Sequence, residues 1–112
     1  MKKREQQREQ AAADALAALG NRTRLRIFKL LVRAGPGGAN VGTIQRMLDV
    51  PAATLAHHLG TLALAGLVGQ QRRGREAICT ANYKAVADVL DYVKGECCTG
   101  LDAAATGHVD AA

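Results

Sequence analysis

The stretch from Val41 to Arg75 constrains the fold of this chain more than any other. It contains two short segments, Val41–Leu48 and Ala52–Ala65, in which apolar residues recur at helical spacing. A tight turn separates them, and we expect Pro51 in the first turn of the second helix, where proline is tolerated. Two short helices joined by so few residues predict a helix-turn-helix unit.

A basic hairpin is expected directly after this unit. The segments Leu67–Gln71 and Glu76–Thr80 alternate well enough for two strands, and Arg72–Arg75 is the expected turn between them. A basic turn alone is a weak signal, because turns are exposed and often charged. A basic hairpin directly after a helix-turn-helix is a more specific signal, and it predicts a wing.

Three further helices complete the expected fold. The first begins in a charged segment near residue 2 and ends at Leu19, before Gly20. The others are Arg22–Ala34, capped by Asn21, and Tyr83–Cys97, capped by Asn82. The predicted fold class is mainly α with a β-hairpin wing, with about five helices in one domain over residues 1–100. Residues 101–112, rich in alanine, are expected to form a flexible tail.

Apolar residues at helical spacing identify the expected core. In chain order these are Leu25, Ile27, Phe28, Leu30, Leu31, Ile44, Met47, Leu48, Leu55, Leu59 and Leu62. Leu16 and Leu19 are the larger apolar contacts of the first helix, which is either a solvated helix or a dimer-interface helix with a basic arm. The last helix has an apolar stripe formed by Val86, Val89, Leu90 and Val93.

Charge and composition narrow the class of partner. The net charge of +5 favours a polyanion, with nucleic acid first and an anionic membrane surface second. Aromatic residues make up only 3%, so stacking of bases on aromatic rings is not expected. No apolar run reaches the roughly 18 residues of a membrane span, and the charged N-terminal segment does not resemble a secretory signal. We therefore expect no membrane partner. The three cysteines are too few and too clustered for a disulfide framework, so we expect reduced thiols in a cytoplasmic protein. No nucleophile–base set or phosphate loop indicates an enzyme.

Side chains on the second helix of the unit and on the wing are the candidates for DNA contact. That helix contains no lysine or arginine, so flanking positive charge must supply much of the affinity. Adjacent histidines point about 100° apart on a helix, so joint metal binding by His57 and His58 is not expected. The candidate residues are Arg46, Thr54, His57, His58, Thr61, Arg72, Arg73 and Arg75.

Cys97 and Cys98 are the sharpest chemical signal. Adjacent thiols at a helix end can converge on one soft ion, and Lys94 nearby is expected to favour the thiolate. A disulfide within the pair would be strained. Such a pair in isolation is often incidental. Cys79 lies on an expected strand, where a buried, inert thiol is the simplest interpretation.

Three segments together resemble the ArsR/SmtB family of winged-helix repressors. They are LAALGNRTRLRIFKLL, LDVPAATLAHHLGTLALAGLV and QQRRGREAICTANY, and the resemblance covers roughly residues 12–98. The family implies a homodimer that binds double-stranded operator DNA without a cofactor. It also implies release of the DNA when a metal or metalloid binds.

The family's sensor sites differ among its members. Many arsenic repressors have Cys-Val-Cys at the start of the third helix, where this chain has Asn40-Val41-Gly42. Zinc, cobalt and nickel sensors use carboxylates and histidines on the last helix, which here has Asp88 and Asp91 but no histidine, so that site is not expected. A third group ends the last helix in Asn-Cys-Cys-Gly, which Glu96–Gly100 resembles. This resemblance implies that Cys97 and Cys98 bind trivalent arsenic or antimony.

The third ligand is where this chain departs from that group, because no cysteine follows Cys98. Cys79, a solvent thiol, or no third protein ligand remain as alternatives. A methylated or phenylated trivalent arsenical already has carbon in one position, so two thiolates would saturate it. We therefore hypothesise a sensor of arsenite, antimonite or an organoarsenical such as methylarsenite. The alternative is a thiol redox switch in the same fold, in which one of the pair bonds to Cys79 or to the other protomer.

Overall fold

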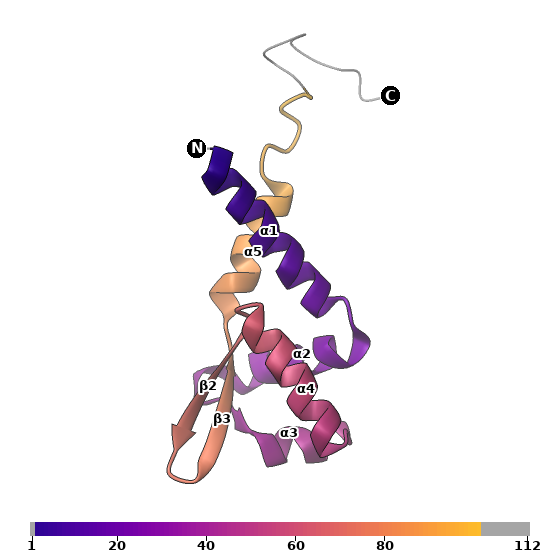
Figure 1. Cartoon of the computed structure of the whole chain (residues 1–112), viewed down its shortest axis with the longest axis vertical. Helices are drawn as coiled ribbons and strands as arrows, with labels where there is room; N and C mark the ends of the chain where they lie inside the picture. Colours follow the sequence, from indigo (N-terminus) through magenta and orange to yellow (C-terminus); the bar gives the residue numbers. More distant parts are fainter. Residues whose placement is uncertain (1, 102–112) are drawn as a thin grey trace.

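The computed structural model describes residues 2–101 and contains five α-helices, a short 3-10 helix and three strands within them (Figure 1). In chain order the elements are α1 (Lys2–Leu19), α2 (Arg22–Ala34), the 3-10 helix (Gly35–Gly37), β1 (Ala39–Asn40), α3 (Val41–Leu48), α4 (Ala52–Leu64), β2 (Val68–Arg73), β3 (Glu76–Ala81) and α5 (Tyr83–Lys94). The expected flexible tail lies outside the described residues from 102 onwards. No helix within the described range is long and apolar enough to cross a membrane.

The strands form an antiparallel sheet in the order β1-β3-β2, with β2 and β3 paired from Val68↔Ala81 to Arg73↔Glu76. This confirms the predicted winged helix-turn-helix, mainly α with a β-hairpin. The two-residue strand β1 was not predicted. It pairs with β3 because Gly38, at φ +67°, brings the chain so close that a Cβ there would collide with the Cys79 carbonyl.

Several predicted boundaries were wrong. Arg72 and Arg73 belong to β2 rather than to the turn. The two strands remain paired as far as Arg73↔Glu76, and the chain reverses at Gly74, which has φ +64°. Helix α4 ends at Leu64, one residue early, and Pro51 precedes its first turn in an extended conformation. Helix α5 ends at Lys94 rather than Cys97, because Gly95 leaves helical geometry at ψ 147°.

The core lies where α2, α3 and α4 meet the sheet. Ile44, Leu55 and Leu62 are fully buried, as predicted, and Leu67 and Cys79 join them from the hairpin. The side chains of α2 that face this core are Ile27, Phe28, Leu30 and Leu31.

Two residues predicted to face the core are instead exposed, Leu25 by 44% and Met47 by 60%, and Leu16 of α1 is exposed by 46%. In α1 the reason is the alanine stripe. Ala12, Ala15 and Ala18 are the buried residues of this helix, and their small side chains let α1 pack closely against its neighbours α2, α4 and α5. Leu16 then falls on the outer side.

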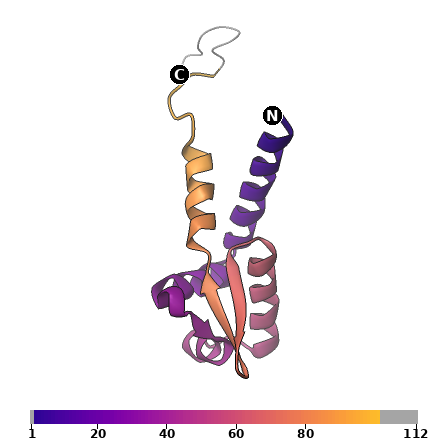
Figure 2. The same ribbon diagram turned by 90° about the vertical axis from the view of Figure 1, so that its left-hand side faces the viewer.

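Helices α1 and α5 lie side by side at their inner ends and diverge away from the core (Figure 2). They extend toward one end of the molecule, while the hairpin tip and α3 lie at the other end (Figure 1). The outer part of the predicted α5 stripe is uncovered, since Leu90 is 53% and Val93 58% exposed. A single chain therefore leaves an apolar surface on the helices farthest from the wing.

The start of α2 gives a test of the local fold. The Oδ1 atom of Asn21 accepts a hydrogen bond from the Arg24 amide at 3.0 Å, as the predicted N-cap. We expect Asn21→Ala to lower the free energy of unfolding by about 1 kcal/mol, because the helix loses its cap. Asn21→Ser keeps an acceptor there and should lose only a small part of this. Urea denaturation of both variants measures the difference.

Candidate nucleic-acid interface and cysteine pair

Both ends of α3 are held by local hydrogen bonds, and the second of them forms the turn to α4. Asn40 caps α3 by accepting a hydrogen bond from the Thr43 amide at 2.7 Å. Asp49 ends it in the left-handed region, φ 54° and ψ 52°, and its amide donates to the Gln45 carbonyl at 2.8 Å. Aspartate adopts this conformation more readily than most residues. The reversal sets α4 across α3, with one side of α4 on the core and the other in solvent.

The four polar candidates of α4 are not equivalent. Thr54 and His57 are exposed, whereas His58 and Thr61 are half-buried. The Thr61 hydroxyl donates to the His57 carbonyl at 3.2 Å, within the helix itself. Thr54 and His57 are therefore the two with side chains directed most fully to solvent.

His58 is turned toward α2. Its Nδ1 lies 3.3 Å from Nη1 of Arg24, and Nε of Arg24 donates to the Ala18 carbonyl at 2.6 Å. Burial lowers the pKa of His58, and the charges of Arg24 and His57 add to the effect. A neutral imidazole can accept from the guanidinium, so His58 links α4 to the α1–α2 junction.

The wing gathers positive charge at the same end of the molecule as α3 (Figure 1). Arg72, Arg73 and Arg75 are all exposed, and Arg73 makes one bond, to Gln71 at 3.3 Å. Arg46 is exposed on α3 and donates to the Thr43 hydroxyl at 3.3 Å. These contacts are weak and solvent-accessible, so the guanidinium groups remain available to phosphate oxygens.

Cys97 and Cys98 lie in a turn beyond α5, at the end of the molecule away from the wing. Both thiols are exposed, and their sulfur atoms are 3.1 Å apart. The turn is held by the Cys97 amide, which donates to the Lys94 carbonyl at 3.1 Å. Its backbone takes positive φ at Glu96 (63°) and Cys98 (65°).

The protonation of Cys97 differs from the expectation based on Lys94. The hydrogen bond with Cys98 raises the pKa of the Cys97 thiol, which is opposite to the predicted direction. A thiophilic ligand that binds this pair must therefore displace protons, and its binding should strengthen as the pH rises.

The structure does not bring Cys79 to this pair. Cys79 lies on β3 in the core with no exposed surface, and burial raises the pKa of its thiol. Within the described residues its thiol makes one hydrogen bond, in which Nε2 of Gln70 donates to Sγ at 3.7 Å. Helix α5 separates it from the pair along the chain. Within residues 2–101 no three histidine, cysteine or carboxylate groups gather into a metal site.

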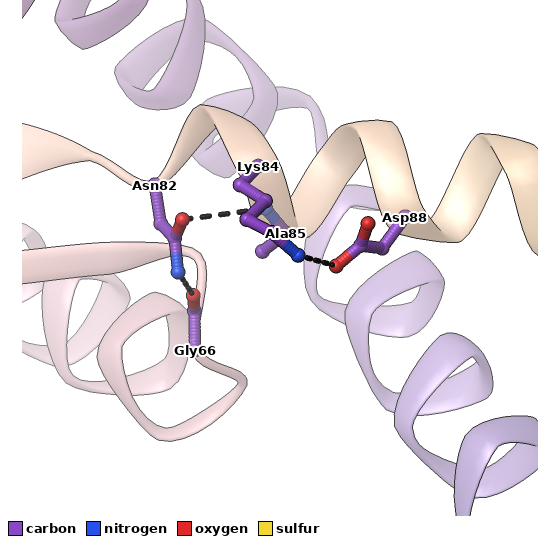
Figure 3. A network of polar contacts seen from close by, with 5 residues as sticks. All are labelled: Gly66, Asn82, Lys84, Ala85 and Asp88. Atoms are coloured by element: carbon purple, nitrogen blue, oxygen red, sulfur yellow. Dashed lines mark hydrogen bonds and ion pairs between the residues drawn. The ribbon is translucent and has the colours of Figure 1, made fainter.

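Asn82 has a second role that the sequence did not reveal. Its Oδ1 accepts from the Ala85 amide as the predicted cap of α5, at 3.3 Å, while its Nδ2 donates to the Gly66 carbonyl at 2.9 Å (Figure 3). Figure 3 also shows Asp88 paired with Lys84 at 2.9 Å. One side chain thus ties the end of the α4 segment to the start of the helix that leads to the cysteine pair.

Comparison with known proteins supports the fold. A family described as "Helix-turn-helix domain" matches residues 19–71. An ArsR-like transcriptional regulator from Rhodococcus sp. RHA1 is 26% identical, with a TM-score of 0.69 over 77% of this chain and 78% of its own. The homodimeric winged helix-turn-helix domain of a possible ArsR-family regulator from Mycobacterium bovis is also 26% identical, with a TM-score of 0.67 over 80% and 82%.

More distant structures share the same fold. The transcriptional repressor BigR from Xylella fastidiosa is 22% identical, with a TM-score of 0.62 over 83% of this chain and 94% of its own. No curated protein sequence matches the chain.

Proposed function

We propose that this chain is an ArsR-type transcriptional repressor, which binds operator DNA as a homodimer and releases it when a trivalent arsenical binds Cys97 and Cys98. It acts in the cytoplasm, where thiols stay reduced. The observation that carries the proposal is the pair of exposed sulfur atoms, 3.1 Å apart, on a winged helix-turn-helix with an arginine-rich wing.

DNA binding is supported by the arrangement of the unit and the wing. Helix α4 has one side in solvent, and the arginines of the wing lie at the same end of the molecule as α3. In this geometry α4 enters the major groove while Arg72, Arg73 and Arg75 contact the backbone or the minor groove. The similar structure from Rhodococcus is an ArsR-like transcriptional regulator, which agrees with this role.

A homodimer is supported by the uncovered apolar surface on the long helices. Leu16 on α1 and Leu90 and Val93 on α5 are each about half exposed in one chain. The similar domain from Mycobacterium bovis is homodimeric. A second copy covering these side chains would place the cysteine pair beside the dimer interface and fix the spacing of the two α4 helices.

The sulfur geometry favours one kind of inducer. A linear two-coordinate ion needs two sulfurs on opposite sides, about 4.6 Å apart for bonds of the length found in thiolate–metal sites. The 3.1 Å separation here instead fits a bent chelate beneath a pyramidal ion. Trivalent arsenic and antimony are thiophilic and pyramidal, so they suit this pair better than a linear soft cation does.

The number of thiols supports an organoarsenical in particular. Two protein thiolates complete the coordination of methylarsenite, while arsenite needs a third ligand that the described structure does not place near the pair. We expect methylarsenite to release labelled operator duplex at a lower concentration than arsenite does. A strong preference for arsenite would contradict the two-thiol site. The titration uses a phosphine reductant, which also keeps the competing redox switch inactive.

The role of Cys79 has its own test. We expect Cys79→Ala to respond to the arsenical as the wild type does, because this thiol lies in the core and away from the pair. The variant should be less stable by about 1 kcal/mol, since it loses a buried group. Inducer titration and urea denaturation of the same sample separate the two effects. A lost response in a folded variant would make Cys79 a ligand.

A further inference from the structure

Gly60 has no role within the protein's own fold. It lies in the interior of α4, about one turn before the last residue of the helix, where glycine is a poor helix former. It is exposed, and a Cβ added at this position would meet no atom within 4 Å. Its φ is not positive. Neither packing nor backbone geometry therefore requires a glycine here.

The direction of Gly60 is outward. Residues 53, 57, 60 and 64 repeat at helical spacing along the side of α4 opposite the buried Leu55 and Leu59. All four are exposed, and Leu64 is exposed by 93%. Gly60 thus interrupts the most protruding line of side chains, one turn after His57.

His57 is the free hydrogen-bonding group on this line. The Thr61 hydroxyl already donates to the His57 carbonyl, and His58 is turned to Arg24. Within residues 2–101 the His57 ring makes no hydrogen bond, and its one neighbouring ring is that of His58, 5.7 Å away between centroids. A ring N–H of an imidazole in the major groove can donate to the N7 acceptor of a purine.

We propose that Gly60 is the position at which duplex DNA comes into contact with the backbone of α4, and that His57, one turn earlier, supplies the hydrogen bond to a base edge. This inference rests on the proposed DNA-binding function and specifies how α4 is seated. The absence of a side chain at position 60 lowers the helix into the groove, which offsets the lack of lysine and arginine on α4. His57 is then a specificity-determining residue.

The test compares Gly60→Ala and Gly60→Leu with the wild type on duplex DNA from upstream of the protein's own gene. Both variants should melt at a temperature higher by roughly 2–6 °C, because alanine and leucine favour a helix. Their affinity for the duplex should nevertheless fall, by about tenfold for alanine and further for leucine. A more stable protein that binds DNA less well is the expected signature.

His57→Ala is the companion variant. It should lose discrimination between the natural duplex and one in which 7-deazaguanine or 7-deazaadenine removes the purine N7 atoms, while the wild type prefers the natural duplex. Wild-type affinity in both Gly60 variants would overturn the close approach while leaving DNA binding intact. If the wild type itself shows no salt-dependent binding to duplex DNA, the proposed function fails, and this inference fails with it.

Discussion

Replacing either thiol of the pair should separate DNA binding from its release. We expect Cys97→Ser and Cys98→Ser to bind operator DNA within about twofold of the wild type, because both thiols are exposed and the segment after α5 lies at the end of the molecule away from the hairpin (Figure 1). The arsenical concentration that releases half of the DNA should rise by about 100-fold or more. The reason is that the second thiolate of the pair binds the same arsenic atom at a high effective concentration, which is lost when one thiolate remains.

Thr99→Ser is the matched control for this prediction, because Thr99 is exposed in the same turn and its hydroxyl, which serine keeps, donates to the Glu96 carbonyl at 2.9 Å. It should respond as the wild type does. Fluorescence anisotropy of a labelled duplex measures both binding and release. Loss of DNA binding in the two cysteine variants would place the pair in the structural frame of the dimer instead of in an inducer site.

The second large effect is expected at the wing. Replacing Arg72, Arg73 and Arg75 together by alanine should weaken duplex binding by about 100-fold near physiological salt, because α4 itself has no cation to compensate. The slope of log K against log salt should become shallower by about 0.9 for each phosphate that the protein no longer neutralises. In a dimer with two wings, the total decrease would reach about 5 if every arginine meets a phosphate.

The matched control removes the same charge elsewhere. Lys2, Lys3 and Arg4 lie on α1 at the end of the molecule away from the hairpin tip (Figure 1). Replacing these three by alanine lowers the net charge equally but should change the affinity and the salt slope much less. Equal reductions in affinity for the two triple variants would mean that net charge, and not the wing, provides the binding.

The strongly amphipathic elements of this fold could be predicted from the sequence. Leu55, Leu59 and Leu62 repeat with a clear period, and all three are buried. Asn21 and Asn82 marked two helix starts correctly. The hairpin also followed from its glycines and arginines, although its strands extend further than the alternation of residues indicated.

Other features depend on contacts between distant parts of the chain, which a local pattern does not contain. The size of Leu16 suggested that it would be a main contact of α1, but α1 packs against its neighbours through its alanines, and Leu16 is exposed. Strand β1 exists because Gly38 approaches Cys79, far away in sequence. The bond from Asn82 to Gly66 is of the same kind.

The cysteine pair combines a predictable and an unpredictable feature. Adjacent thiols can be identified in any sequence, whereas the turn that orients them depends on Gly95 leaving the helix three residues earlier than predicted. Within that turn Cys98 has a positive φ and the two sulfur atoms lie 3.1 Å apart. The adjacency of the two thiols could therefore be read from the sequence, while the turn that holds them could not.

One titration tests the central claim most directly. The protein is bound to labelled duplex DNA from upstream of its own gene, in a phosphine reductant, and methylarsenite or zinc is added while anisotropy is followed. The proposed site predicts release of the DNA near one methylarsenite per protomer, and no release by zinc at the same concentration, since the described residues form no site for it. DNA that stays bound at saturating arsenical, or that zinc alone releases, would contradict the proposed mechanism.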